Sequence, residues 1–111
     1  MIKLNKFIVL SFLLAASVLS GATYKGQKVY IESCKECHGG GQELAGSKKM
    51  TTWEKFMDQK GEKLAGVHMS SKRAHESWEY FESRKFTKDS RHLEDFLVEY
   101  ARDSGNVPAC N

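Results

Sequence analysis

The sequence has little of what breaks helices or builds strands. Its only proline is Pro108, and residues 65–105 contain no proline and no sustained alternation of apolar and polar residues. It also lacks an internal repeat that would indicate a solenoid or a second cofactor site. Basic and acidic residues are interleaved, which is typical of solvated helix faces and not of a nucleic-acid-binding patch. The sequence therefore predicts an all-α protein with no nucleic-acid partner.

Long apolar runs are also missing, except for residues 7–18 near the start, which follow two lysines. This run is too short for a comfortable membrane span. Ser20 and Ala22 satisfy the small-x-small rule for cleavage after Ala22. We predict a signal peptide over residues 1–22 and a periplasmic mature protein, with a retained N-terminal anchor as the alternative. No cysteine follows the run, so a lipoprotein anchor is not indicated, and no membrane contact is expected after cleavage.

Cysteine is scarce, with three residues, and two of them fall in one motif. Residues 34–38 form Cys-Lys-Glu-Cys-His, the C-x-x-C-H signature of covalent haem attachment. Two intervening residues hold the thiols of Cys34 and Cys37 at the separation of neighbouring haem vinyl groups, and His38 is then placed to become the proximal axial ligand. A dithiol redox pair expects a βαβ neighbourhood, and a zinc site expects a matching Cys or His pair downstream. Neither is visible, so we predict haem c, with its iron, as the cofactor.

The mature chain, residues 23–111, would form one monohaem domain of 89 residues. A domain of this size has little surface to bury, and a covalently held haem would fill that shortage as core. Without the two lysines of the signal peptide, the 17 basic residues become 15 against 14 acidic ones, a net charge of about +1. The basicity of the whole chain therefore belongs partly to the signal peptide.

The first predicted helix leads into the haem motif. Gly26, Tyr30 and Cys34 recur at four-residue spacing and therefore lie close to one helix face. Three glycines follow at residues 39–41, where the missing side chains would let backbone pass close to the haem edge. They could also offer a carbonyl to the second nitrogen of His38, and a plain flexible turn is the alternative.

Three further helices are predicted. The second begins at the T-x-x-E capping box of Thr51 and Glu54 and ends at Gly61. The third follows Ser71, and the fourth begins at a Ser90 cap. The inward positions are Trp53, Phe56 and Met57 in the second helix, Ala74, Trp78 and Phe81 in the third, and Leu93, Phe96, Leu97 and Tyr100 in the fourth, which runs to Gly105.

This layout resembles the class I c-type cytochromes. In that family an N-terminal helix with Gly-x-x-x-aromatic-x-x-x-Cys crosses a C-terminal helix with Leu-x-x-aromatic. The matching positions are Gly26, Tyr30 and Cys34, with Leu97 and Tyr100 as the partner pair. The resemblance is specific at these two helices and at the haem motif, and the middle of the chain does not match. It implies a small all-α cytochrome c-like fold of about four helices packed around one covalently attached haem.

The distal ligand departs from the family. A methionine is usual near the position of residues 83–85, and this chain has none there. His68 and Met69 lie in a predicted loop after a turn at residues 64–66, where a side chain is free to point at iron. By family habit we favour Met69, with His68 as the alternative and a vacant or exchangeable site third. Of the remaining candidates, Met57 is assigned to the core, and His75 and His92 are assigned to the surface.

The distal ligand decides the function, because a thioether raises the haem potential, a second histidine lowers it, and an open site permits gas binding. We predict a periplasmic cytochrome that carries single electrons between redox partner proteins and is not an enzyme. A haem-based sensor or ligand-binding protein is the alternative, and a dedicated haem subunit of an oxidoreductase is a further one.

The third cysteine, Cys110, lies in a C-terminal tail formed by residues 106–111. An unpaired thiol in an oxidising compartment invites a partner. An intermolecular disulfide through Cys110 and an inert thiol packed against the domain are equal alternatives. No other side chains form a catalytic set: Glu76, Glu79 and Glu82 have helical spacing, which a solvated face explains.

Overall fold

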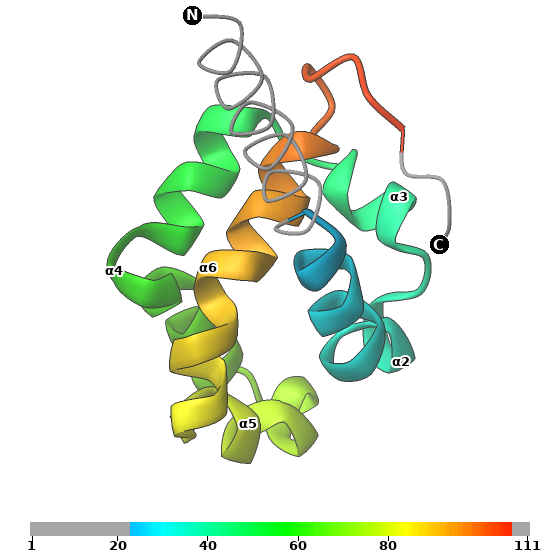
Figure 1. Ribbon diagram of the computed structural model, residues 1–111. Helices are drawn as coiled ribbons and strands as arrows, with labels where there is room; N and C mark the ends of the chain where they lie inside the picture. The colour runs from blue at the N-terminus through cyan, green and yellow to red at the C-terminus, as the bar shows by residue number, and fades with distance from the viewer. Residues whose placement is uncertain (1–22, 108–111) are drawn as a thin grey trace, which may run out of the picture.

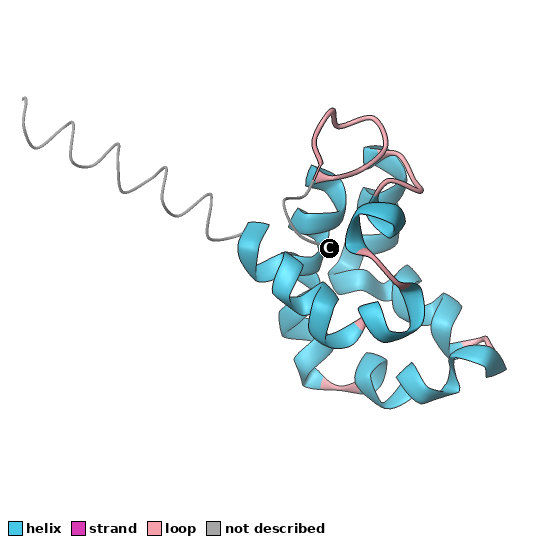
Figure 2. Ribbon diagram, turned by 90° about the vertical axis from the view of Figure 1, so that its right-hand side faces the viewer, coloured by secondary structure: helices cyan, strands magenta, loops and turns pink. Residues whose placement is uncertain are grey.

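The computed structural model describes residues 23–107, which form helices joined by short loops (Figures 1 and 2). No strand occurs within this range. The predicted all-α class is therefore confirmed. The predicted signal peptide and Cys110 lie outside the described residues. Between residues 23 and 107, no helix is both long and apolar enough to cross a membrane.

The helical elements are arranged around α6 (Arg84–Glu99), which packs against α4 (Met50–Met69) (Figure 1). It is also contacted by α3 (Gly41–Ala45) and α5 (Trp78–Glu82). The four predicted helices correspond to residues 23–33, to α4, to a 3-10 helix continued by α5, and to α6. The other elements, in chain order, are α2 (Lys35–His38), α3 (Gly41–Ala45), the 3-10 helix η1 (Lys72–Ser77) and α5 (Trp78–Glu82).

The core lies on one face of α6. Its buried residues recur at three- and four-residue spacing, as expected for an amphipathic helix. Met57 is 2% exposed, which confirms its assignment to the core. Trp53, equally buried, donates a hydrogen bond from its indole Nε1 to the Ala45 carbonyl at 2.9 Å. The buried residues of α6 are Phe86, Ser90, Leu93, Phe96 and Leu97.

The helix over residues 23–33 crosses α6 at Gly26, as the family resemblance implied. A Cβ atom at Gly26 would overlap the His92 carbonyl oxygen and lie 2.8 Å from Phe96 Cβ. The aromatic partner differs from the prediction. Tyr30 packs on Phe96, with ring centroids 5.5 Å apart, and Tyr100 lies against Phe96 at 5.3 Å. The ring at the crossing is therefore Phe96, and Leu93 with Phe96 repeats the Leu-x-x-aromatic spacing one turn before Leu97 and Tyr100.

The start of α4 is capped differently from the prediction. The helix begins at Met50 with Lys49 as N-cap, and no N-cap side chain hydrogen-bonds to it, so the expected capping box at Thr51 is wrong. Instead, the Met50 N–H donates to Asp103 Oδ1 at 2.8 Å. The chain after α6 returns to this point, where Arg102 N–H also donates to the Lys48 carbonyl at 3.0 Å. A carboxylate at a helix N-terminus satisfies a free N–H and interacts favourably with the helix dipole.

Replacing this carboxylate tests the long-range cap. Asp103→Ala should lower the free energy of unfolding by about 0.5–2 kcal/mol, because the Met50 N–H loses its acceptor. Urea denaturation followed by circular dichroism measures the loss. Asp103→Asn is the matched control, since it keeps an oxygen acceptor and loses only the charge, and its deficit should shrink at high salt. Equal stability of Asp103→Ala and wild type would contradict the cap.

Regular helical geometry breaks off just before Gly61, close to the end predicted for the second helix, and α4 consists of two helical segments joined at this kink. The chain leaves helical geometry at residues 58–61, with φ of 51° at Gln59, 58° at Lys60 and 76° at Gly61, and then continues as α4 to Met69. Gly61 lies over Phe86 of α6, since a Cβ there would be 2.5 Å from Phe86 Cζ. The predicted turn at residues 64–66 is therefore helical.

The boundary of α6 also differs from the prediction. The helix begins at Arg84, and Ser83 caps it by accepting a hydrogen bond from the Phe86 N–H at 3.3 Å. Ser90, the predicted cap, is buried within the helix and donates to the Thr87 carbonyl at 2.9 Å. The helix ends at Glu99 and not at Gly105, the predicted end. Gly105 has a φ of 79°.

Candidate functional site

The haem motif forms a single turn of helix. The His38 N–H donates to the Cys34 carbonyl at 3.0 Å, and the Cys37 N–H approaches the same oxygen at 3.3 Å. Residues at positions i, i+3 and i+4 of a helix lie on one face. Cys34, Cys37 and His38 are therefore grouped on one side of the turn, with Cys34 half-buried against the core and the other two exposed. Cys34 and Cys37 do not form a disulfide with each other.

The end of the motif is fixed to the core by Tyr30. This tyrosine is 1% exposed, and its hydroxyl donates to the Gly39 carbonyl at 2.6 Å. Burial raises the pKa of Tyr30 to about 12, so the phenol keeps the proton that it donates. Gly39 has a φ of 77°, a conformation that favours glycine. We expected a carbonyl of residues 39–41 to accept a hydrogen bond from His38, but the Gly39 carbonyl accepts one from Tyr30.

The structure brings His68 to His38. The two ring centroids are 5.8 Å apart and the ring planes make an angle of 76°. His68 comes from the last turn of α4, 30 positions along the chain, and not from the loop that the sequence predicted. Partial loss of hydration around the His38 ring, and secondly the neighbouring His68, lower the pKa of His38. A neutral imidazole is the form that binds a metal.

Three contacts hold His68 in place. Its Nδ1 lies 2.7 Å from the Leu64 carbonyl oxygen. Its ring packs on Phe81, with centroids 4.3 Å apart and planes at 31°. Its own carbonyl accepts a hydrogen bond from Trp78 Nε1 at 2.8 Å. The sequence placed Phe81 and Trp78 on an inward face but gave no sign that they position His68.

The other two histidines lie away from this pair. His75 is exposed, with Nδ1 3.1 Å from the Lys72 carbonyl and its ring edge-on to Trp78, which confirms the prediction of a surface residue. His92 is partly buried, and its Nδ1 is buried without a hydrogen-bond partner among residues 23–107. Its prediction as a surface residue was wrong, because its helix position lies at the crossing with Gly26.

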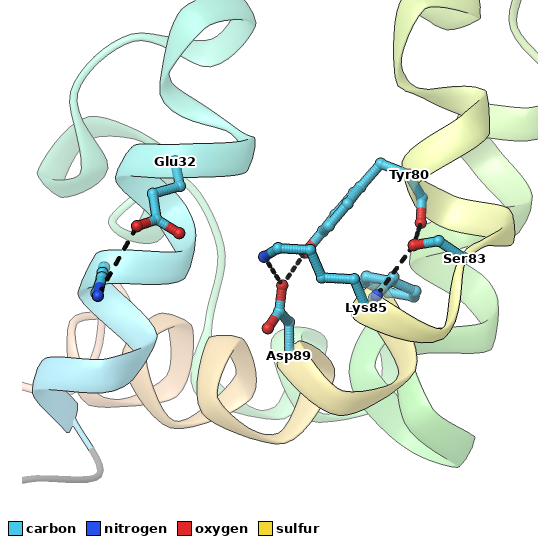
Figure 3. Close-up of polar contacts among 7 residues, drawn as sticks. Glu32, Tyr80, Ser83, Lys85 and Asp89 are labelled. Carbon is cyan, nitrogen blue, oxygen red and sulfur yellow. Dashed lines mark hydrogen bonds and ion pairs between the residues drawn. The ribbon is translucent and has the colours of Figure 1, made fainter.

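A polar network that sequence reasoning missed joins α5 to α6 (Figure 3). Asp89 Oδ2 accepts hydrogen bonds from the Tyr80 hydroxyl and from Lys85 Nζ, both at 2.8 Å. Burial raises the pKa of Tyr80, so the phenol is the donor. The i, i+4 spacing of Lys85 and Asp89 was the available signal for half of this network.

The electrostatics at Cys34 bear on the dithiol alternative. Burial, and secondly the nearby Asp89, raise the pKa of the Cys34 thiol to about 12. The attacking cysteine of a dithiol oxidoreductase has a lowered pKa, because the thiolate is the nucleophile. As a free thiol, Cys34 has the opposite property, which argues against Cys34 as the attacking thiol of a dithiol redox pair.

The site therefore offers two thiols on one helical turn and two imidazoles side by side, with their ring planes nearly perpendicular. Within residues 23–107, no group of three or more His, Cys, Asp or Glu side chains is placed to hold a metal ion. A haem needs only two axial ligands from the protein, because its macrocycle supplies the other four. In comparisons with protein-family models, with curated proteins and with solved structures, nothing matches this chain.

Proposed function

We propose that this protein is a c-type cytochrome that holds one haem through Cys34 and Cys37 and transfers single electrons between redox partner proteins. The observation that carries the proposal is the C-x-x-C-H turn together with a second imidazole, that of His68, whose ring centroid lies 5.8 Å from that of His38. The haem would supply a reversible one-electron couple at its iron.

The residues of the site fit such a group. Cys34 and Cys37 lie on the same side of the turn as His38, as attachment and axial ligation by adjacent residues require. The bond from Tyr30 to Gly39 ties the end of this turn to the buried crossing. This hydrogen bond would therefore hold His38, the residue before Gly39, in a fixed position relative to the core.

The two attachment residues differ in burial. Cys34 is half-buried against the core, whereas Cys37 is exposed. One attachment point would thus lie within the fold and the other nearer its surface. We further propose, from the pattern of residues 1–22, that the mature protein acts in the periplasm. We assign no catalytic residue.

Covalent attachment is the test. The full chain should be produced together with export and haem-maturation machinery, then denatured and extracted with acidified organic solvent. Wild-type protein should retain its haem, and Cys34→Ser or Cys37→Ser should weaken that retention, because each removes one thioether bond. Haem content is measured from the absorption of the denatured protein.

Cys110 offers a matched control for this experiment. Cys110→Ser removes a thiol outside the motif and should leave haem retention unchanged. Free extraction of haem from the wild-type protein, produced under the same conditions, would overturn the proposal.

A further inference from the structure

We infer that His68 is the second axial ligand, so that iron would be bound between two histidines with no open position. This inference rests on the proposed function, because it presupposes a haem attached at Cys34 and Cys37. His68 takes the place of Met69, the distal ligand that the family resemblance favoured.

The first step is the separation of the two rings. Imidazole nitrogen binds a first-row metal at about 2.0–2.1 Å, and two rings bound end to end to one metal therefore have centroids about 6 Å apart. The centroids of His38 and His68 are 5.8 Å apart. Rings that share a metal–nitrogen axis can take any mutual rotation, so the observed 76° between their planes is compatible with such a pair.

The second step is which nitrogen of His68 is available. Its Nδ1 lies 2.7 Å from the Leu64 carbonyl oxygen. A carbonyl can only accept, so Nδ1 carries the proton and Nε2 keeps its free lone pair. Histidines that bind metals almost always donate their other N–H to a carbonyl, a carboxylate or water, which fixes the tautomer and the ring orientation. His68 already has this arrangement with the preceding turn of α4.

The third step is the support behind the ring. Phe81 packs against one face of His68, and Trp78 holds the His68 carbonyl through its indole N–H. Both residues come from α5, so the position of the imidazole is set by packing between two elements. A ligand held by packing and by outer hydrogen bonds is preorganised for its metal.

The fourth step concerns Met69. Neighbouring residues of an α-helix are rotated by about 100° around its axis, so Met69 cannot point in the direction of His68. The structure places both residues in α4, where the loop freedom assumed from the sequence does not exist. His75 is exposed and bonded to Lys72, and His92 lies on α6 at the Gly26 crossing.

Two histidine ligands would have two consequences. They lower the reduction potential relative to a histidine–methionine pair. They also fill both axial positions, which favours the electron carrier over the gas sensor.

The test uses the intact haem protein and its spectra. Wild-type protein should be six-coordinate and low-spin, should not bind carbon monoxide, and should lack the long-wavelength charge-transfer band of a thioether bound to ferric haem. His68→Ala should become high-spin and bind carbon monoxide, and added imidazole should restore the low-spin spectrum. Met69→Leu is the matched control on the adjacent position and should leave the spectrum unchanged.

His68→Met provides a second variant if His68→Ala does not fold, because it keeps a ligand and should create the thioether band while raising the potential. A thioether band in the wild type that disappears in Met69→Leu would overturn the inference. So would a low-spin spectrum that His68→Ala leaves unchanged. These results differ from failure of the proposed function, in which haem would be extracted freely from the wild-type protein.

Discussion

Phe96→Ala should lower the free energy of unfolding by about 3–5 kcal/mol, the usual range for removing a fully buried aromatic ring. Phe96 is 0% exposed and lies between the rings of Tyr30 and Tyr100. Its ring tip also reaches Gly41, where a Cβ would be 2.8 Å from Phe96 Cζ. The ring therefore contacts three parts of the fold, and these cannot all move in to fill the cavity that its removal leaves.

The loss is large for a small domain, since folded proteins of this kind are stable by only about 5–15 kcal/mol in total. It should appear as a lower urea midpoint with an unchanged slope when unfolding of variant and wild type, prepared in the same way, is followed by circular dichroism. Tyr100→Ala is the matched control, because Tyr100 is partly exposed and contacts Phe96 from one side. A greater loss from Tyr100→Ala would instead support the partner pair predicted from the sequence.

The sequence predicts those parts of the fold that depend on local spacing. Apolar residues at three- and four-residue intervals between Leu93 and Tyr100 predicted the helix that the structure shows as α6, and the family resemblance at Gly26 and Tyr30 implied a close crossing. The partner ring was missed by one turn, because Leu93-x-x-Phe96 and Leu97-x-x-Tyr100 have the same spacing. Only packing across the crossing distinguishes the two.

Helix ends were predicted less well, because their partners lie elsewhere in the chain. Thr51 has the sequence of a cap, but Asp103 supplies the acceptor for α4. Ser83 and Ser90 are both suitable N-cap residues, and the extended backbone at Ser83, with ψ of 158°, decides where α6 begins. A cap requires this backbone geometry as well as the side chain.

The candidate site divides in the same way. Cys34, Cys37 and His38 form a local motif, so their grouping on one turn follows from four intervening peptide bonds. The choice between His68 and Met69 is not local. It depends on α4 resuming after the kink at residues 58–61, and on Phe81 and Trp78 packing against its last turn. Neither condition can be inferred from the two residues themselves.

The helix crossing at Gly26 leads to the second large effect. Gly26→Ala should lower the free energy of unfolding by about 1–3 kcal/mol or more, because the added methyl group would overlap the His92 carbonyl oxygen. A backbone oxygen in the middle of α6 cannot move aside as a flexible side chain can. The helix over residues 23–33 must therefore shift away from α6, which also weakens the packing of Tyr30 on Phe96.

Gly66→Ala is the matched control, since Gly66 also lies in a helix and a Cβ there would meet nothing within 4 Å. Alanine is the better helix former by about 0.5–1 kcal/mol, so this variant should be slightly more stable than wild type. The same gain acts at Gly26, and a net loss there measures the crowding at the crossing. If Gly26→Ala were as stable as Gly66→Ala in urea denaturation, the two helices could not approach as closely as the structure places them.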